Sequence, residues 1–174
     1  GNYFERQIKL WMRQYQNHDE TIERFERLAD WLTANLITDN QRTIVHGDYR
    51  LANIIIAPDV PKVAAVLDWE LSTLGHPLAD FTYNLSQWYL PNFNAAFGKV
   101  TLCDADLEAL GIPDMEPYAQ SYFARRGVTV SPKQLYYGIA FNLYRLAGII
   151  IGVIGRTKSG TAKNEFARST AHNL

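Results

Sequence analysis

Apolar residues recur at the spacing of an amphipathic helix over most of this chain. In the second such stretch, Asp19 stands as an N-cap before apolar positions that repeat every three or four residues. Ser131 and Pro132 mark the start of the longest stretch, because proline is favoured at the first position of a helix. The helices predicted in this way span residues 3–16, 19–36, 78–90, 104–111, 116–126, 132–154 and 161–171.

Three short apolar runs predict β-strands in the middle of the chain. They span residues 43–46, 53–57 and 63–67, and the prolines of the segment PDVPK between the last two exclude a helix there. Residues 92–103 follow no regular pattern. The strands stand together and do not alternate with helices, so the order differs from that of a parallel α/β sheet. We therefore expect an α+β fold that is mostly helical, with a small β-hairpin patch.

The composition suits one globular unit in a reducing compartment. The 174 residues, 47% of them hydrophobic and 20% charged, can bury one sizeable core. Cys103 is the only cysteine, which excludes an internal disulfide and a zinc site built from cysteines. The N-terminal segment lacks the apolar core of a signal peptide. We therefore expect a cytoplasmic protein, and we expect no nucleic-acid partner.

One segment, residues 135–154, is long and apolar enough to span a bilayer. Arg145 lies in its middle, and an arginine there costs about 2.5–3.5 kcal/mol on insertion scales. Asn142 and three glycines add to that cost. We therefore predict a buried core helix and no membrane partner.

A polar loop, HGDYRLAN, follows the first predicted strand. A hairpin needs only about two to five connecting residues, so the extra length indicates chemistry. Asp48 and Asn53 stand in the pattern H-x-D-x-x-x-x-N, which has the spacing of the protein-kinase catalytic loop. Such a loop brings a carboxylate to an attacking hydroxyl and an amide oxygen to a metal ion on the triphosphate. Asp68 ends the third strand, so Asn53 and Asp68 are candidate Mg²⁺ ligands and Asp48 is the candidate base.

The segments VHGDYRLANII, VLDWELSTLGHPLAD and FNLYRLAGI resemble the aminoglycoside phosphotransferase and choline kinase family. The similarity covers about residues 3–170 and extends in particular to the kinase-like domains associated with acyl-CoA dehydrogenases. The resemblance implies a protein-kinase-like fold. It also implies that ATP and Mg²⁺ serve to transfer a γ-phosphoryl group to a hydroxyl of a small molecule, which Asp48 would orient or deprotonate.

The chain departs from the pattern of complete kinases. His-Gly-Asp stands in place of His-Arg-Asp, so no arginine is available there to receive an activation-loop phosphate. The 174 residues also contain no Gly-rich phosphate loop and no strand lysine with a partner glutamate. We therefore expect residues 1–174 to form the C-terminal lobe alone, inactive without the N-terminal nucleotide lobe. An apolar surface should be exposed where that lobe docks, and it would favour self-association.

The resemblance suggests roles for three further residues. His46 is expected to pack and hold the loop, because Asp48 already supplies the base. Arg50 lies near the position of a γ-phosphate lysine in protein kinases, so it contacts phosphate or forms a structural ion pair. Asp80 is either an ordinary acid at a helix start or the anchor of the loop, accepting hydrogen bonds from the backbone N–H groups of residues 46–48.

Arg145 and Arg156 are the candidates for acceptor recognition. A cation within an apolar helix needs a partner or a cleft, so Arg145 either forms a buried ion pair or contacts a substrate anion. Residues 128–174 carry six lysines and arginines against Glu165 alone. Such a surface suits a neutral or anionic acceptor, such as a hydroxy acid or an acyl-CoA-like molecule, and would repel a polycationic aminoglycoside.

Two other functions fit part of the pattern. A catalytically silent kinase-like scaffold or binding lobe would keep the fold without turnover, although the presence of Asp48, Asn53 and Asp68 argues against it. A metal-dependent hydrolase using Asp48 and Asp68 would need a further histidine or carboxylate to complete its metal site. Mg²⁺-dependent nucleotide binding would distinguish the phosphotransferase from both.

Overall fold

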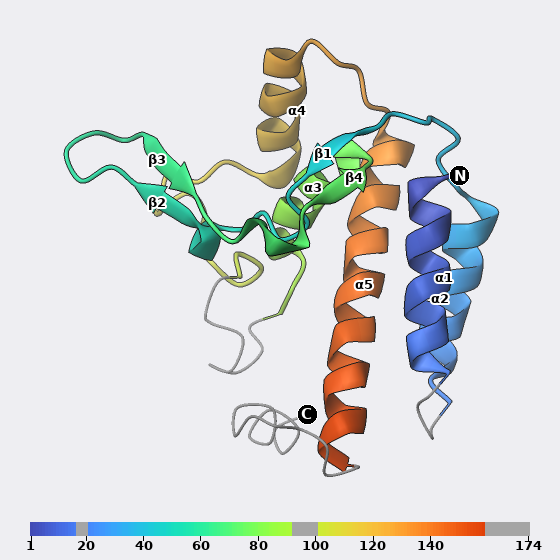
Figure 1. The fold of residues 1–174 in the computed structure, drawn as a ribbon. Coiled ribbons are helices and arrows are strands. Elements are labelled where there is room, and N and C mark those ends of the chain that lie inside the picture. The colour runs from blue at the N-terminus through green and yellow to red at the C-terminus, as the bar shows by residue number, and fades with distance from the viewer. Residues whose placement is uncertain (17–20, 92–100, 159–174) are drawn as a thin grey trace.

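The computed structural model describes residues 1–16, 21–91 and 101–158 of the chain. Helices α1 (Tyr3–Tyr15) and α2 (Glu23–Ala34) lie beside the long helix α5 (Pro132–Lys158), as Figure 1 shows. Aromatic rings fill the space between them. Phe25 of α2 stacks on Tyr144 of α5 with ring centroids 4.4 Å apart, and Phe4 of α1 meets Phe141 of α5 at 4.9 Å.

Helix α5 is the core helix that the sequence predicts. By length and hydropathy, its span Pro132–Thr157 would also qualify as a membrane-crossing helix, the one such helix within the described residues. It packs against α1, α2 and α3, and the side chains of Tyr137, Phe141 and Tyr144 are at most 1% exposed. Burial against other helices thus accounts for the apolar face of its N-terminal part.

Helix α3 (Pro77–Leu85) crosses α5 at very short range. The crossing point is Gly138 of α5, where a Cβ atom would lie 2.7 Å from the side chain of Thr82. The fully buried amide of Asn142 donates hydrogen bonds to the carbonyl oxygen of Ala79 at 3.0 Å and to the hydroxyl of Thr82 at 2.9 Å. Close packing and buried polar contacts therefore fix α3 on α5.

Helix α4 (Met115–Arg126) also packs on α3. The ring of Phe81 on α3 stacks on Tyr122 of α4 with centroids 3.8 Å apart and meets Phe123 at 5.1 Å. Helix α4 ends before Gly127, the glycine that marks its end in the sequence.

The strands form two separate antiparallel pairs. Strand β1 (Thr43–Val45) pairs with β4 (Thr73–Gly75), and β2 (Ile54–Ile56) pairs with β3 (Val63–Val66). The β2–β3 hairpin projects away from the helices in Figure 1. Short 3₁₀ turns occur at Leu51–Asn53, Trp69–Leu71 and Ser86–Trp88.

The mostly helical α+β fold is confirmed, but some elements differ from the prediction. Strand β4 is an addition to the prediction, and α2 begins at Glu23 with Ile22 as its N-cap. Asp19 and the helix predicted over 161–171 lie outside the described residues.

The prediction of a helix over residues 104–111 is wrong, because the segment forms turns. Its hydrogen bonds change span from one residue to the next: Leu110 N–H donates to the carbonyl of Asp106, and Gly111 N–H to that of Glu108. The Asp106 side chain accepts from the N–H of Ala109. So short a segment cannot offset the cost of helix nucleation, and its aspartate competes for backbone partners.

The crossing of α3 and α5 predicts a contrast between two glycines of α5. Gly138→Ala should destabilise the chain by about 1–3 kcal/mol, because the new methyl group overlaps the branched side chain of Thr82. Gly152→Ala is the matched control, since its Cβ would meet only the end of the Arg156 side chain, at 3.4 Å. It should be neutral or stabilise by up to about 1 kcal/mol through helix propensity. Urea unfolding of both variants measures this, and equal stability of the two would contradict the packing described here.

Candidate active site

The loop between β1 and β2 turns at a position that requires glycine. Gly47 has a φ angle of +86°, in the left-handed region that side chains disfavour. A Cβ atom there would also lie 2.7 Å from the carbonyl oxygen of Leu71. The turn carries the chain from the buried His46 to the half-buried Asp48.

The carboxylate of Asp80 holds this turn. It accepts hydrogen bonds from the backbone N–H of His46 and, at 2.8 Å, from that of Gly47. Asp80 lies in the first turn of α3, which is fixed on α5. The contacts expected of Asp80 are thus present, and they connect the loop to the helical core.

His46 connects the same loop to the β2–β3 hairpin. Its Nε2 lies 2.7 Å from the carbonyl oxygen of Leu67, and its Nδ1 accepts a hydrogen bond from the N–H of Asp48 at 3.2 Å. Because a carbonyl oxygen can only accept, the hydrogen of this contact lies on Nε2. Both ring nitrogens are therefore engaged, as in a packed histidine that holds a loop.

Asp48 and Asn53 face each other across the loop. The side-chain amide nitrogen of Asn53 donates to the backbone carbonyl of Asp48 at 2.9 Å and to its carboxylate oxygen Oδ2 at 3.0 Å. Arg50 donates from Nε to the same Oδ2 at 3.2 Å. Arg50 was expected either to contact phosphate or to form a structural ion pair, and the contact with Asp48 is an ion pair.

Asp68 follows β3 in a left-handed conformation, with a φ angle of +63°, and its side chain is exposed. The preceding residue, Leu67, makes two contacts with the loop. Its N–H donates to the carbonyl of Asn53 at 2.8 Å, and its carbonyl meets His46. The backbone beside Asp68 is thus attached to the loop that carries Asp48 and Asn53.

The oxygen atoms of this site fit the coordination preferences of Mg²⁺. The amide nitrogen of Asn53 is engaged by Asp48, so its oxygen is the atom left to meet a cation. Asp68 adds an exposed carboxylate. Mg²⁺ commonly binds one or two protein oxygen ligands together with waters and substrate phosphates. In the part of the chain that the structure describes, no group of three His, Cys, Asp or Glu side chains could hold a metal ion.

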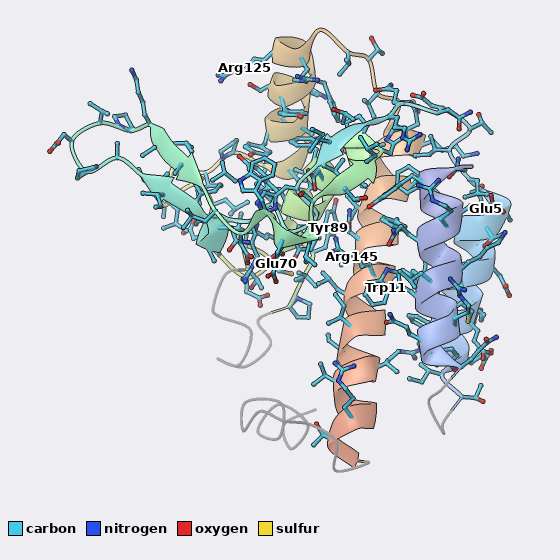
Figure 2. The ribbon with its side chains drawn as sticks, in the orientation of Figure 1. Glu5, Trp11, Glu70, Tyr89, Arg125 and Arg145 are labelled. Atoms are coloured by element: carbon cyan, nitrogen blue, oxygen red, sulfur yellow. The ribbon has the colours of Figure 1, made fainter. Side chains whose placement is uncertain are left out.

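Arg145 contacts the loop in a way that neither sequence-based alternative described. Its guanidinium donates to the backbone carbonyl of Gly47 at 2.6 Å and lies over the ring of Tyr83, 5.3 Å from the centroid. Figure 2 shows Arg145 on α5, between this helix and the β segments. Arg156 lies eleven residues further along α5 and is exposed, so the structure does not bring the two arginines together.

The sequence analysis did not identify Tyr83, although it lies beside the candidate base. Its hydroxyl lies close to the Asp48 side chain. Burial raises the pKa of Tyr83 well above its usual value, and hydrogen bonding and charge from the nearby Asp48 raise it further. Its position three residues after Asp80 places both side chains on one face of α3, which is the signal that could have indicated it.

A family model and several known proteins match this chain. The family model described as "Phosphotransferase enzyme family" matches residues 1–117. Acyl-CoA dehydrogenase family member 10 of Mus musculus is 39% identical over 98% of this chain, and family member 11 of Rattus norvegicus is 35% identical over 99%. The chain covers only 16% and 22% of these two relatives.

Solved structures show the same relationship. A crystal structure from Ralstonia eutropha, titled a "putative aminoglycoside phosphotransferase", matches 99% of this chain with 39% identity and a TM-score of 0.87. The chain spans 52% of that protein. Aminoglycoside-3'-phosphotransferase of type VIII shares the fold, with 15% identity and a TM-score of 0.50 over 79% of this chain. On the family model and these relatives together, the chain belongs to the phosphotransferase enzyme family.

Proposed function

We propose that this chain supplies the catalytic loop and metal-binding residues of an ATP- and Mg²⁺-dependent kinase that phosphorylates a hydroxyl of a small molecule. The observation that carries the proposal is the hydrogen-bonded pair of Asp48 and Asn53, held on the helical core by Asp80. The backbone contacts of Leu67 attach Asp68 to the same loop. This corresponds to the C-terminal lobe of a protein-kinase-like fold.

In this proposal, Asp48 orients the acceptor hydroxyl and takes its proton as the phosphoryl group transfers. Asn53 and Arg50 fix its carboxylate through Oδ2, so that the rotation of the side chain is restricted before the acceptor binds. The oxygen of Asn53 and the carboxylate of Asp68 would hold Mg²⁺. When bound, this ion would offset the negative charge of the nucleotide phosphates.

The groups that bind the nucleotide phosphates would come from a further lobe outside these 174 residues. The exposed apolar surface near the site supports this part of the proposal. Large apolar side chains in the β segments are unusually exposed, with Ile44 at 69%, Val63 at 53% and Trp69 at 51%. The same group includes Leu51, Ile55, Ile56, Val60, Leu67, Leu71 and Leu74. Such a surface suits a docking lobe, and without that lobe it would favour self-association.

The acceptor in this proposal is neutral or anionic, such as a hydroxy acid or its acyl-CoA-like thioester. The excess of lysine and arginine over Glu165 in residues 128–174 supports it. The names of the curated relatives, which are acyl-CoA dehydrogenase family members, point to acyl thioesters. Arg145 itself is engaged with Gly47, so the preference rests on the overall charge of this segment.

Asp48→Asn tests the catalytic step in the complete kinase, meaning this chain together with its nucleotide lobe. Turnover, measured as ADP release from MgATP, should fall by about 10²-fold or more, because a general base acts chiefly in the transition state. The dissociation constant for MgATP should stay within about threefold. The matched control is Asp59→Asn, an exposed acid in the β2–β3 turn, which should change neither value. A parallel loss of nucleotide binding in Asp48→Asn would instead make Asp48 a binding residue.

Asp68→Asn should separate metal binding from nucleotide binding. Because it removes a charged oxygen ligand, the Mg²⁺ concentration needed for half-maximal ATP binding should rise about tenfold or more. Binding of ATP in the presence of EDTA should not change. Calorimetric titrations at several Mg²⁺ concentrations measure both quantities, with Asp59→Asn again as control. An unchanged Mg²⁺ requirement would remove Asp68 from the proposed metal site.

Acceptor choice can be tested with a hydroxy fatty acid, its CoA thioester and kanamycin. We expect kcat/KM to be at least tenfold higher for the acid or the thioester, because a basic surface opposes the approach of a polycation. Analogues without the hydroxyl group serve as controls that distinguish transfer from ATP hydrolysis. Efficient phosphorylation of kanamycin, with no activity on either acidic compound, would show that the acceptor proposal is wrong.

A further inference from the structure

Side chains from two helices reach the same three residues of the catalytic loop. Asp80 and Tyr83 come from one face of α3, and Arg145 comes from α5. Asp80 accepts from the backbone N–H groups on one side of the turn, and Arg145 donates to the carbonyl of Gly47 on the other. The ring of Tyr83 lies under the guanidinium of Arg145, and its hydroxyl lies close to the carboxylate of Asp48.

We propose that Tyr83 and Arg145 are a pair of positioning residues that fix the turn at Gly47 and the carboxylate of Asp48 for phosphoryl transfer. The inference rests on the proposed catalytic role of Asp48. In this inference, Arg145 binds the backbone of the loop and does not bind the acceptor. It also gives a role in the reaction to Tyr83, which the kinase-like motif does not include.

The contact of Arg145 is well suited to hold a turn that is built on a glycine. Gly47 is in the left-handed region, and the hydrogen bond to its carbonyl comes from a charged donor, which makes it stronger than a neutral one. The flat guanidinium also lies over the Tyr83 ring, a favourable cation–π arrangement. The ring therefore helps to hold the arginine in place, which links the two residues physically.

The contact of Tyr83 restricts the carboxylate of Asp48 from the interior. Oδ2 of Asp48 already accepts from Asn53 and from Arg50, but the Arg50 side chain is 40% exposed. Tyr83 is half-buried and lies against the guanidinium of Arg145. A phenol is protonated at neutral pH, so its hydroxyl can donate to the carboxylate. It therefore orients Asp48 and does not compete with it as a base.

Two variants remove these contacts separately, and each has a matched control. Tyr83→Phe deletes the hydroxyl and leaves a ring for Arg145. Its control is Tyr118→Phe, which removes a hydroxyl that donates to the side chain of Asn84 at 3.3 Å. Arg145→Met deletes the guanidinium and keeps an apolar side chain in α5. Its control is Arg125→Met, on the exposed surface of α4.

The first measurement is amide hydrogen exchange on the chain itself, by NMR, and it needs neither nucleotide nor acceptor. Arg145→Met should accelerate exchange of the His46 and Gly47 amides about tenfold or more, because the turn loses one of its two attachments. Amides in the middle of α5 should exchange at unchanged rates, which shows that the variant is folded. The two controls should leave the loop amides unchanged.

The second measurement is ADP release from MgATP by the complete kinase. Tyr83→Phe should lower kcat about tenfold and Arg145→Met at least tenfold, while KM for MgATP stays within about twofold. A purely structural role would lower only the amount of folded enzyme, so kcat per active site, with the sites counted by MgATP binding, would not change. The double variant should lose less than the product of the single effects, because the two residues fix the same loop.

The possible results separate this inference from the proposed function. Faster loop exchange in Arg145→Met, with reduced kcat in both variants, supports the positioning pair. Unchanged loop exchange, or unchanged kcat in Tyr83→Phe while Asp48→Asn is inactive, overturns it. Full activity of Asp48→Asn would overturn the proposed function and the catalytic part of the inference, and loop exchange would still decide whether Arg145 holds the turn.

Discussion

The hydrogen bonds from the backbone of His46 and Gly47 to the Asp80 carboxylate are the interaction on which the site depends. The loop has little regular structure of its own, and the conformational freedom of Gly47 makes its left-handed turn costly to fix in entropy. A carboxylate in the first turn of α3 satisfies two backbone donors at once, and the helix itself cannot move without disturbing the core. The contacts of Asp80 therefore restrict the motion of the loop, because α3 is packed in the helical core.

The β segments reach the same loop from the other side. His46 and Asn53 both contact the backbone of Leu67, so the residue before Asp68 cannot shift independently of Asp48. The candidate base and the candidate metal ligands therefore form one mechanical unit, although they are separated in sequence by a whole hairpin. The internal distances of such a site are set by contacts within this chain.

The sequence predicted the parts of this arrangement that depend on local pattern. Helical spacing indicated α1, α3, α4 and α5, and the spacing of Asp48, Asn53 and Asp68 indicated the loop and its neighbouring strand. Strand β4 escaped prediction, because its sequence TLG lacks the run of β-branched or apolar residues that marked the other strands, and its pairing with β1 is a long-range contact. Arg145 was recognised as unusual, but its partner is a backbone carbonyl 98 residues away, which no side-chain pattern reveals. Tyr83 was missed because its closeness to Asp48 depends on which face of α3 meets the loop, although its spacing from Asp80 could have indicated that face.

The contact of Gly138 with Thr82 has an evolutionary consequence. A larger residue at position 138 would need a smaller one at position 82, but the hydroxyl of Thr82 is also a partner of the buried amide of Asn142. Without that hydroxyl, the buried amide of Asn142 would lose a hydrogen-bond partner, and an asparagine in the core would become less favourable. The three positions should therefore change together in distant relatives, and a chain that has replaced one of them alone should be rare.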